Sequence, residues 1–134
     1  MLPIKKKILV IDDEELLIRT MSRLLEKIGY EVYCVKSGMD AEALVLEQDV
    51  DFIISDVRMP GKNGVEVVKS LIKIVWERYQ RIVPYLFITG FADKQAEDDA
   101  LKLKPLAYLM KPFDLKELTS AVSKGLEPRS KVIV

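Results

Sequence analysis

The sequence contains no histidine and only one cysteine, Cys34. Without histidine, this chain cannot supply a histidine metal ligand, a histidine general base or a phosphohistidine. A single cysteine cannot form a disulfide within the chain. Because Cys34 falls in the predicted strand 31–35, we expect a small buried hydrophobic residue in a reducing cytoplasm, not a reactive thiol.

Long apolar runs and an excess of one charge are also absent. No stretch approaches the roughly 20 apolar residues that span a bilayer, and the N-terminus lacks the apolar segment of a signal peptide. Lys plus Arg and Asp plus Glu both number 21, so the formal net charge is zero and no nucleic-acid surface is predicted. The run Lys5-Lys6-Lys7 is shorter than basic patches of about 5–8 residues that bind partners. We therefore expect a cytoplasmic protein that binds neither membranes nor nucleic acid.

Strand and helix patterns alternate along the 134 residues, of which 49% are apolar and 31% charged. Strands are predicted at 7–11, 31–35, 52–55, 85–88 and 107–110. Helices are predicted at 14–28, 37–47, 64–77, 93–103 and 114–125, and the segment 60–64 is predicted as a loop. This alternation predicts an α/β fold, a doubly wound parallel sheet with helices on both faces. Length and composition favour one domain over residues 1–134, with a core at about 6–126 and a short tail at 127–134.

The first predicted helix has a clear apolar face. Leu17, Met21, Leu24 and Ile28 recur at helical spacing and are expected to face the core. Gly29 follows them at the position of a C-terminal cap, so the helix is expected to end there.

Polar residues with related chemistry follow four of the predicted strands. Asp12 and Asp13 follow the first strand, Asp56 the third, Thr89 the fourth and Lys111 the fifth. Open parallel sheets bind ligands beyond the carboxyl ends of their strands, so we expect these side chains to meet at one edge. Taken singly, each has an ordinary explanation, such as an acidic helix start or a capped turn. Their agreement at four strand ends indicates a functional site.

The expected site suits phosphoryl transfer to an aspartate. Three carboxylates close together repel one another, and a divalent cation such as Mg²⁺ relieves that repulsion. Lys111 would approach the phosphoryl oxygens from the side opposite the metal, aimed inward by a cis Lys111-Pro112 bond. Thr89 could donate a hydrogen bond to a phosphoryl oxygen, for which Gly90 leaves room. Asp56 is then placed to act as the nucleophile.

Four segments around the strand ends form motifs that are specific as a set. These are Ile8-Leu9-Val10-Ile11-Asp12-Asp13-Glu14, Ile54-Ser55-Asp56-Val57-Arg58-Met59-Pro60-Gly61, Ile88-Thr89-Gly90 and Tyr108-Leu109-Met110-Lys111-Pro112-Phe113. Together they closely resemble the receiver domain of two-component response regulators, and the resemblance covers residues 6 to about 126.

The resemblance implies a role for each matching site residue. Asp56 would be the phosphoacceptor, and Lys111 would bind the phosphoryl group. Asp13 would ligate Mg²⁺ directly, Asp12 partly through water, and the backbone carbonyl of Arg58 would be a further ligand.

The resemblance also implies a switch, partners and a fold. Thr89 would be the switch hydroxyl, and Tyr108 would turn inward when Thr89 moves toward the phosphate. The phosphoryl donor would be the phosphohistidine of a sensor histidine kinase or phosphotransfer protein. An unknown output protein or domain would read the face made by the fourth helix, fifth strand and fifth helix, and contacts there could include a phosphorylation-dependent homodimer. The implied fold is the flavodoxin-like (βα)5 sheet with strand order 2-1-3-4-5.

The chain departs from the family pattern in two segments. The stretch 74–84 is longer than the common connection, and its aromatic residues Trp76 and Tyr79 are expected to cover the core edge, with a partner contact as the alternative. Residues 102–106 replace the usual small-residue turn before the fifth strand, which alters the expected output face.

Two rival functions remain open. A phosphohydrolase with an aspartyl-phosphate intermediate would usually carry a second acid two residues after its nucleophile, where this chain has Arg58. A degenerate receiver that acts only as a binding module would not be expected to keep the complete set of site residues. We therefore expect a signalling switch, not an enzyme, with Arg58 and Phe91 tuning hydrolysis by controlling water access.

Overall fold

The computed structural model describes residues 4–59, 62–90 and 93–127. Its centre is a five-stranded parallel sheet in the order β2-β1-β3-β6-β7, in which β6 and β7 are the fourth and fifth strands along the chain. The strands are β1 (Lys7–Ile11), β2 (Glu31–Val35), β3 (Phe52–Asp56), β6 (Tyr85–Thr89) and β7 (Ala107–Met110). The predicted strand order 2-1-3-4-5 is therefore confirmed.

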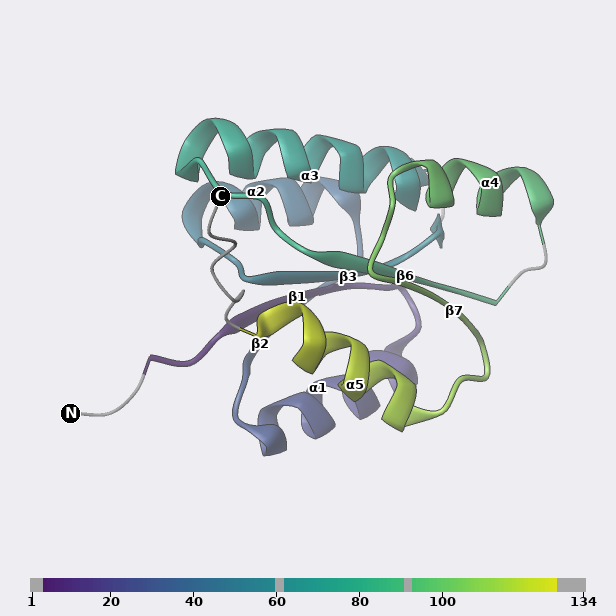
Figure 1. Cartoon of the computed structure of the whole chain (residues 1–134), viewed down its shortest axis with the longest axis horizontal. Helices are drawn as coiled ribbons and strands as arrows, with labels where there is room; N and C mark the ends of the chain where they lie inside the picture. The colour runs from purple at the N-terminus through teal and green to yellow at the C-terminus, as the bar shows by residue number, and fades with distance from the viewer. Residues whose placement is uncertain (1–3, 60–61, 91–92, 128–134) are drawn as a thin grey trace, which may run out of the picture.

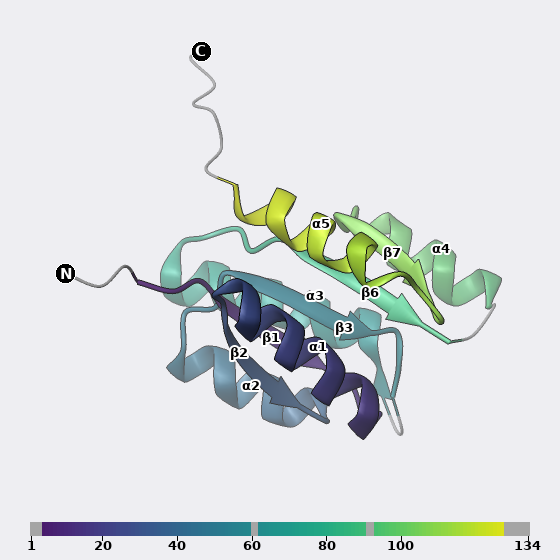
Figure 2. The ribbon, with the colours of Figure 1, turned by 90° about the horizontal axis from the view of Figure 1, so that it is seen from below.

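Helices cover both faces of this sheet (Figures 1 and 2). One face carries α1 (Glu15–Ile28) and α5 (Leu115–Leu126), and the other carries α2 (Gly38–Glu47), α3 (Gly64–Tyr79) and α4 (Lys94–Lys102). Side-chain oxygens of Ser37, Asn63, Asp93 and Asp114 cap the first turns of α2, α3, α4 and α5. The predicted doubly wound α/β architecture is confirmed.

The strands read as continuous apolar runs because both of their faces are buried. Leu9, Ile53 and Phe87 belong to the core cluster that also contains buried residues of α2, α3 and α4. Ile8 and Phe52 belong to the opposite cluster, together with buried residues of α1 and α5. Two packed cores thus hold the strand ends in register.

The buried face of α1 differs from the predicted one. Ile18, Met21 and Leu25 are the buried residues of the helix, whereas Ile28 is 50% exposed. Leu17 and Leu24 are only partly buried, because their apolar neighbours Ile18 and Leu25 take the buried positions, and the predicted stripe was also wrong at Ile28.

Two further predictions were wrong in detail. Cys34 is exposed because β2 is an edge strand, and its thiol lies 3.7 Å from the Ser22 hydroxyl. The predicted loop 60–64 is flanked by a small antiparallel ladder in which Arg58 pairs with Asn63. This ladder, β4 (Arg58–Met59) with β5 (Lys62–Asn63), is too short for a periodic sequence signal.

Tyr79, at the end of α3, and Arg81, in the connection that follows, bond this segment to neighbouring parts of the fold. The Tyr79 hydroxyl donates to the Val45 carbonyl at 2.8 Å, so this aromatic residue covers the core edge as predicted. Trp76 does not cover the core edge, since it is 54% exposed. The role of Trp76 as a core cover was therefore predicted wrongly.

Arg81→Ala is expected to lower the free energy of unfolding by about 1–2 kcal/mol. The Arg81 guanidinium lies 2.8 Å from both Asp49 and Asp51, and the other Asp51 oxygen accepts a 2.7 Å hydrogen bond from the Lys7 amide. Partial exposure of the pairs keeps the expected value small. Urea denaturation measures it, with Lys73→Ala as the control, because Lys73 has only an exposed 4.0 Å pair with Glu77. Equal losses in both variants would contradict a specific role for Arg81.

Candidate functional site

The predicted site residues meet at the carboxyl edge of the sheet. Asp56 and Thr89 end β3 and β6, and Asp12 and Lys111 directly follow β1 and β7. Hydrogen bonds continue the ladders past the strand ends: the Asp12 amide donates to Val35 O at 3.1 Å and the Lys111 amide to Thr89 O at 2.7 Å. The main chain thus fixes the point from which each functional side chain departs.

Three carboxylates form the centre of the site. Asp12, Asp13 and Asp56 each offer an oxygen atom, and these atoms lie within 4.8 Å of one another. Asp12 and Asp56 are buried, whereas Asp13 is exposed. Backbone amides orient the buried pair, since the Glu14 amide donates to Asp12 Oδ1 at 2.9 Å and the Arg58 amide to Asp56 Oδ1 at 3.1 Å. Of the three carboxylates, that of Asp13 is the one exposed to solvent.

This cluster fits a hard divalent cation. Asp12 Oδ2 is buried and accepts no hydrogen bond from the residues that the structure describes, although the Lys111 ammonium lies 3.4 Å from it as an ion pair. Burial raises the pKa of Asp12, the Glu14 amide lowers it, and the negative charge of Asp56 raises it further. A bound cation would stabilise the ionised carboxylate of Asp12 against burial and the charge of Asp56, and carboxylate oxygens are the ligands that Mg²⁺ prefers. The carbonyl of Arg58 stays a predicted fourth ligand.

Lys111 closes the site from the other side. Its Nζ lies 3.1 Å from Asp56 Oδ2, 3.4 Å from Asp12 Oδ2 and 3.5 Å from Glu14 Oε1. Burial lowers the pKa of Lys111, but the hydrogen bond to Asp56 and the charges of Asp12, Asp56 and Glu14 raise it more, so the net shift is upward. The ammonium is therefore held charged beside the carboxylate of Asp56. The Lys111-Pro112 bond is cis, as predicted.

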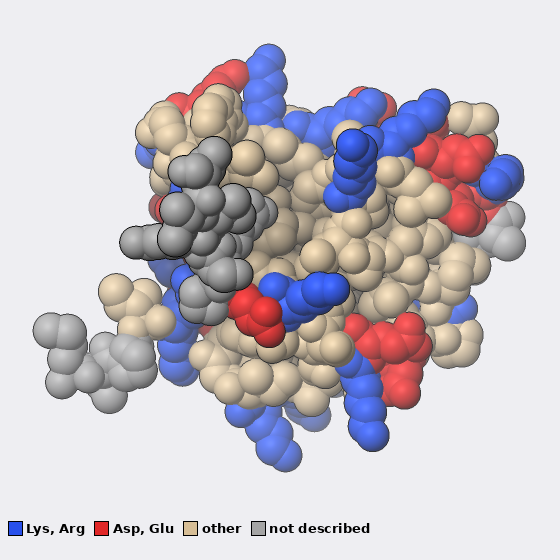
Figure 3. Space-filling view, viewed as in Figure 1, with Lys and Arg blue, Asp and Glu red and all other residues tan. Residues whose placement is uncertain are grey.

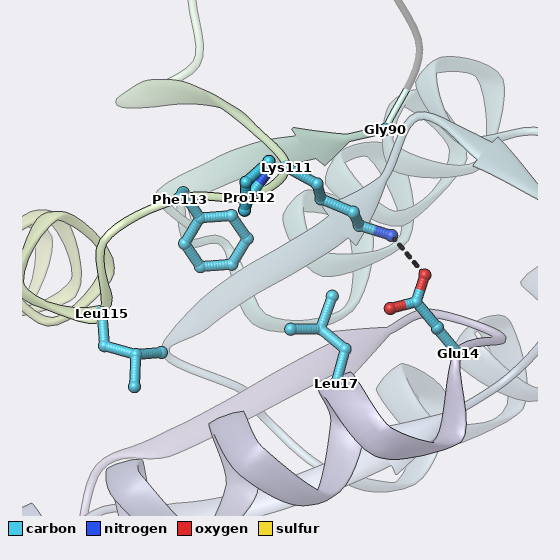
Figure 4. Close-up of a pocket in the computed structure, with 7 residues that line it drawn as sticks. All are labelled: Glu14, Leu17, Gly90, Lys111, Pro112, Phe113 and Leu115. Atoms are coloured by element: carbon cyan, nitrogen blue, oxygen red, sulfur yellow. Dashed lines mark hydrogen bonds and ion pairs between the residues drawn. The ribbon is translucent and has the colours of Figure 1, made fainter.

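A pocket of about 430 Å³ opens beside Lys111 (Figure 4). Leu17, Phe113 and Leu115 form its apolar walls, and the Lys111 ammonium reaches across it toward Glu14. Glu14 was not predicted as a site residue, although its position directly after the acidic pair was a usable signal. The pocket gives the lysine side of the site a route to solvent.

The predicted switch residues Thr89 and Tyr108 are in contact. Thr89 is 1% exposed, and its side chain is hydrogen-bonded to that of half-buried Tyr108. Burial and the negative charges of Glu97 and Asp93 raise the pKa of Tyr108, so its phenol stays protonated. The structure thus links Thr89, on the strand next to that of Asp56, to Tyr108, which packs toward α4.

Gly64 is a site residue that sequence reasoning missed. It begins α3, and its amide donates to the Val57 carbonyl at 2.7 Å. A Cβ atom at this position would overlap the carbonyl oxygen of Asp56. In the sequence, the one signal for this close approach to the Asp56 carbonyl was a glycine directly after the capping residue Asn63. Phe91, proposed to tune hydrolysis, lies outside the described residues.

Comparisons with known proteins agree with this fold and site. Residues 8–123 match the response regulator receiver domain model, so the chain belongs to the receiver-domain family of two-component response regulators. It is 29% identical over 124 residues to the regulatory protein AtoC of Escherichia coli (strain K12), a match that covers 92% of this chain and 26% of AtoC. The chain therefore spans about a quarter of the length of that relative.

Solved structures show the same fold. A CheY-like receiver domain protein from Methanospirillum hungatei JF-1 is similar with a TM-score of 0.82 at 23% identity, covering 92% of this chain and 95% of that one. The response regulator TrrA from Thermotoga maritima, in complex with Mg(2+)-BeF, is similar with a TM-score of 0.75 at 27% identity, covering 90% and 99%. Among the residues described here, no helix is long and apolar enough to cross a membrane.

Proposed function

We propose that this receiver domain is a phosphorylation-controlled switch in which Asp56 accepts a phosphoryl group with the help of Mg²⁺. The observation that carries the proposal is the position of Asp56 between a lysine ammonium and a pair of carboxylates. Lys111 Nζ lies 3.1 Å from one Asp56 oxygen, and the carboxylates of Asp12 and Asp13 form a cation site with Asp56. Phosphoryl transfer depends mainly on such positioning and charge neutralisation.

The family supports a phosphohistidine donor on a sensor histidine kinase or phosphotransfer protein, and that histidine would belong to the partner because this chain has none. An Asp56 oxygen attacks phosphorus, the phosphorus–nitrogen bond breaks, and the imidazole leaves with the electron pair. Lys111 holds one phosphoryl oxygen and the Thr89 hydroxyl donates to another. Asp12, Asp13 and Asp56 would hold Mg²⁺, which would neutralise negative charge as the phosphoryl group arrives. Water later hydrolyses the aspartyl phosphate and restores the carboxylate.

The output follows from the contact between Thr89 and Tyr108. A phosphoryl oxygen competes with Tyr108 for the Thr89 hydroxyl, so phosphorylation favours a second arrangement of the tyrosine. The altered face is made by α4, β7 and α5, where Leu106 and Met110 are 41% and 43% exposed. Figure 3 shows a broad uncharged area on this side of the molecule, with charged side chains mainly around it. An output domain or a second copy of the chain would bind there.

Acetyl phosphate with Mg²⁺ tests this function. A stable phosphoryl adduct, detected by mass spectrometry of the intact chain, is the expected result. Rapid multiple turnover without an adduct would favour the phosphohydrolase instead, and no adduct under any condition would favour the degenerate binding module. We propose a switch and not an enzyme because Arg58, not an acid, stands two residues after Asp56.

Removing divalent metal with EDTA is expected to slow phosphorylation by about 100-fold or more, because a bound cation contributes several kcal/mol to such reactions. Without the cation, an incoming phosphoryl group would face three uncompensated carboxylates. The initial rate of adduct formation measures the effect, and restoring excess Mg²⁺ is the control. An unchanged rate in EDTA would contradict the metal site.

A further inference from the structure

Arg58 and Asp93 form an ion pair at the rim of the acidic site. Nη2 of Arg58 lies 3.3 Å from Oδ2 of Asp93. Arg58 is two residues after Asp56, and Asp93 immediately precedes α4. The pair therefore joins the segment that carries the phosphoacceptor to the helix of the proposed output face.

Asp93 has two further connections. Its other oxygen, Oδ1, accepts a hydrogen bond from the Ala96 amide at 3.2 Å and so caps the first turn of α4. Its negative charge also contributes to the raised pKa of Tyr108. One carboxylate thus contacts Arg58 and the start of α4 and acts on the environment of the switch tyrosine.

A phosphoryl group on Asp56 would compete with Asp93 for Arg58. Phosphorylation adds about −1.5 to −2 charges and strong acceptor oxygens, which a guanidinium binds in a forked geometry. The Arg58 amide already donates to Asp56 Oδ1 at 3.1 Å, and its side chain is 52% exposed. The guanidinium can therefore change partners by rotating its own side chain while the main chain stays in place.

We propose that Arg58 exchanges Asp93 for the phosphoryl group on Asp56, and that this exchange carries the phosphorylation signal to α4 by a second route beside Thr89 and Tyr108. The inference rests on the proposed function, because it needs a phosphoryl group at Asp56. In the free chain, the Arg58 guanidinium is paired with Asp93. In the phosphorylated chain, Asp93 keeps its capping bond but loses its cation.

The competition predicts tighter binding of a phosphoryl analogue by Asp93→Asn. The probe is beryllofluoride with Mg²⁺, titrated calorimetrically into the whole chain. Asparagine keeps the capping oxygen and removes the charge, and the strength of exposed ion pairs predicts a decrease in Kd of about 1.4- to 5-fold. Arg58→Gln should increase the Kd. In the double variant, Asp93→Asn should have no further effect, a result that a purely structural role of Asp93 would not produce.

Lys94→Gln is the matched control. It removes the 3.4 Å ion pair with Asp98 on the same helix, and it should bind the analogue like wild type. An unchanged Kd in Asp93→Asn, or the same decrease when Arg58→Gln is also present, would overturn the inference alone. Failure of wild type to bind the analogue would overturn the proposed function and this inference together.

Discussion

Asp56→Asn is expected to abolish phosphorylation by acetyl phosphate and Mg²⁺. The amide has no anionic oxygen to attack phosphorus, and the cation site loses one of its three carboxylates. Asparagine has nearly the shape of aspartate, so its carbonyl oxygen can still accept the 3.1 Å hydrogen bond from the Arg58 amide. Intact-mass spectrometry should show no adduct, while circular dichroism should show an unchanged fold.

The stability of Asp56→Asn carries further information. Asp56 raises the pKa of buried Asp12, which shows that their charges repel. Removing that repulsion should offset the loss of the Lys111 ion pair, so the free energy of unfolding should change little. Asp99→Asn, at a partly exposed acid on α4, serves as the control and should be phosphorylated like wild type. An adduct that survives in Asp56→Asn would place the phosphoryl group elsewhere and refute the assignment.

Gly64→Ala is expected to destabilise the fold by about 3 kcal/mol or more, because the added methyl group would overlap main-chain atoms. It would collide with the Asp56 carbonyl oxygen and lie 3.0 Å from the Val57 carbonyl oxygen. Neither atom can rotate away as a flexible side chain could. The segment that carries Asp56 must shift, and a displacement of about 1 Å should slow phosphorylation by roughly 100-fold. Urea denaturation and the rate of adduct formation measure the two effects.

Gly90→Ala is the matched comparison for stability. A Cβ at Gly90 would meet only the Lys111 side chain, at an ordinary 3.6 Å. Its free energy of unfolding should stay within about 0.5 kcal/mol of wild type. Equal stability of the two alanine variants would show that the close approach at Gly64 does not constrain the Asp56 segment.

The sequence predicted which side chains meet at this edge of the sheet because strand ends are local features. An apolar run followed by an acid places Asp12 and Asp56 at the same edge once the strands are parallel, and the same holds for Lys111. Thr89 was found in the same way. The five-stranded fold was predicted from the alternation of short apolar strand runs with helices of helical apolar spacing.

The errors concern features that depend on distant parts of the chain. Exposure of Ile28 depends on which side of α1 packs on the sheet, and exposure of Cys34 depends on β2 being an edge strand. The ion pair of Arg58 with Asp93 joins residues from two loops. No local sequence pattern predicts these exposures or this ion pair, because tertiary packing determines them.

The placement of α5 restricts how the sheet can grow. The connections through α3 and α4 lead outward toward β7 over one face, whereas α5 returns over the face that carries α1 (Figure 1). A parallel strand added next to β7 through α5 would make a left-handed crossover, and about 98% of such crossovers are right-handed. β7 therefore stays an edge strand of the five-stranded sheet, and an edge strand is where a further segment or another chain can pair.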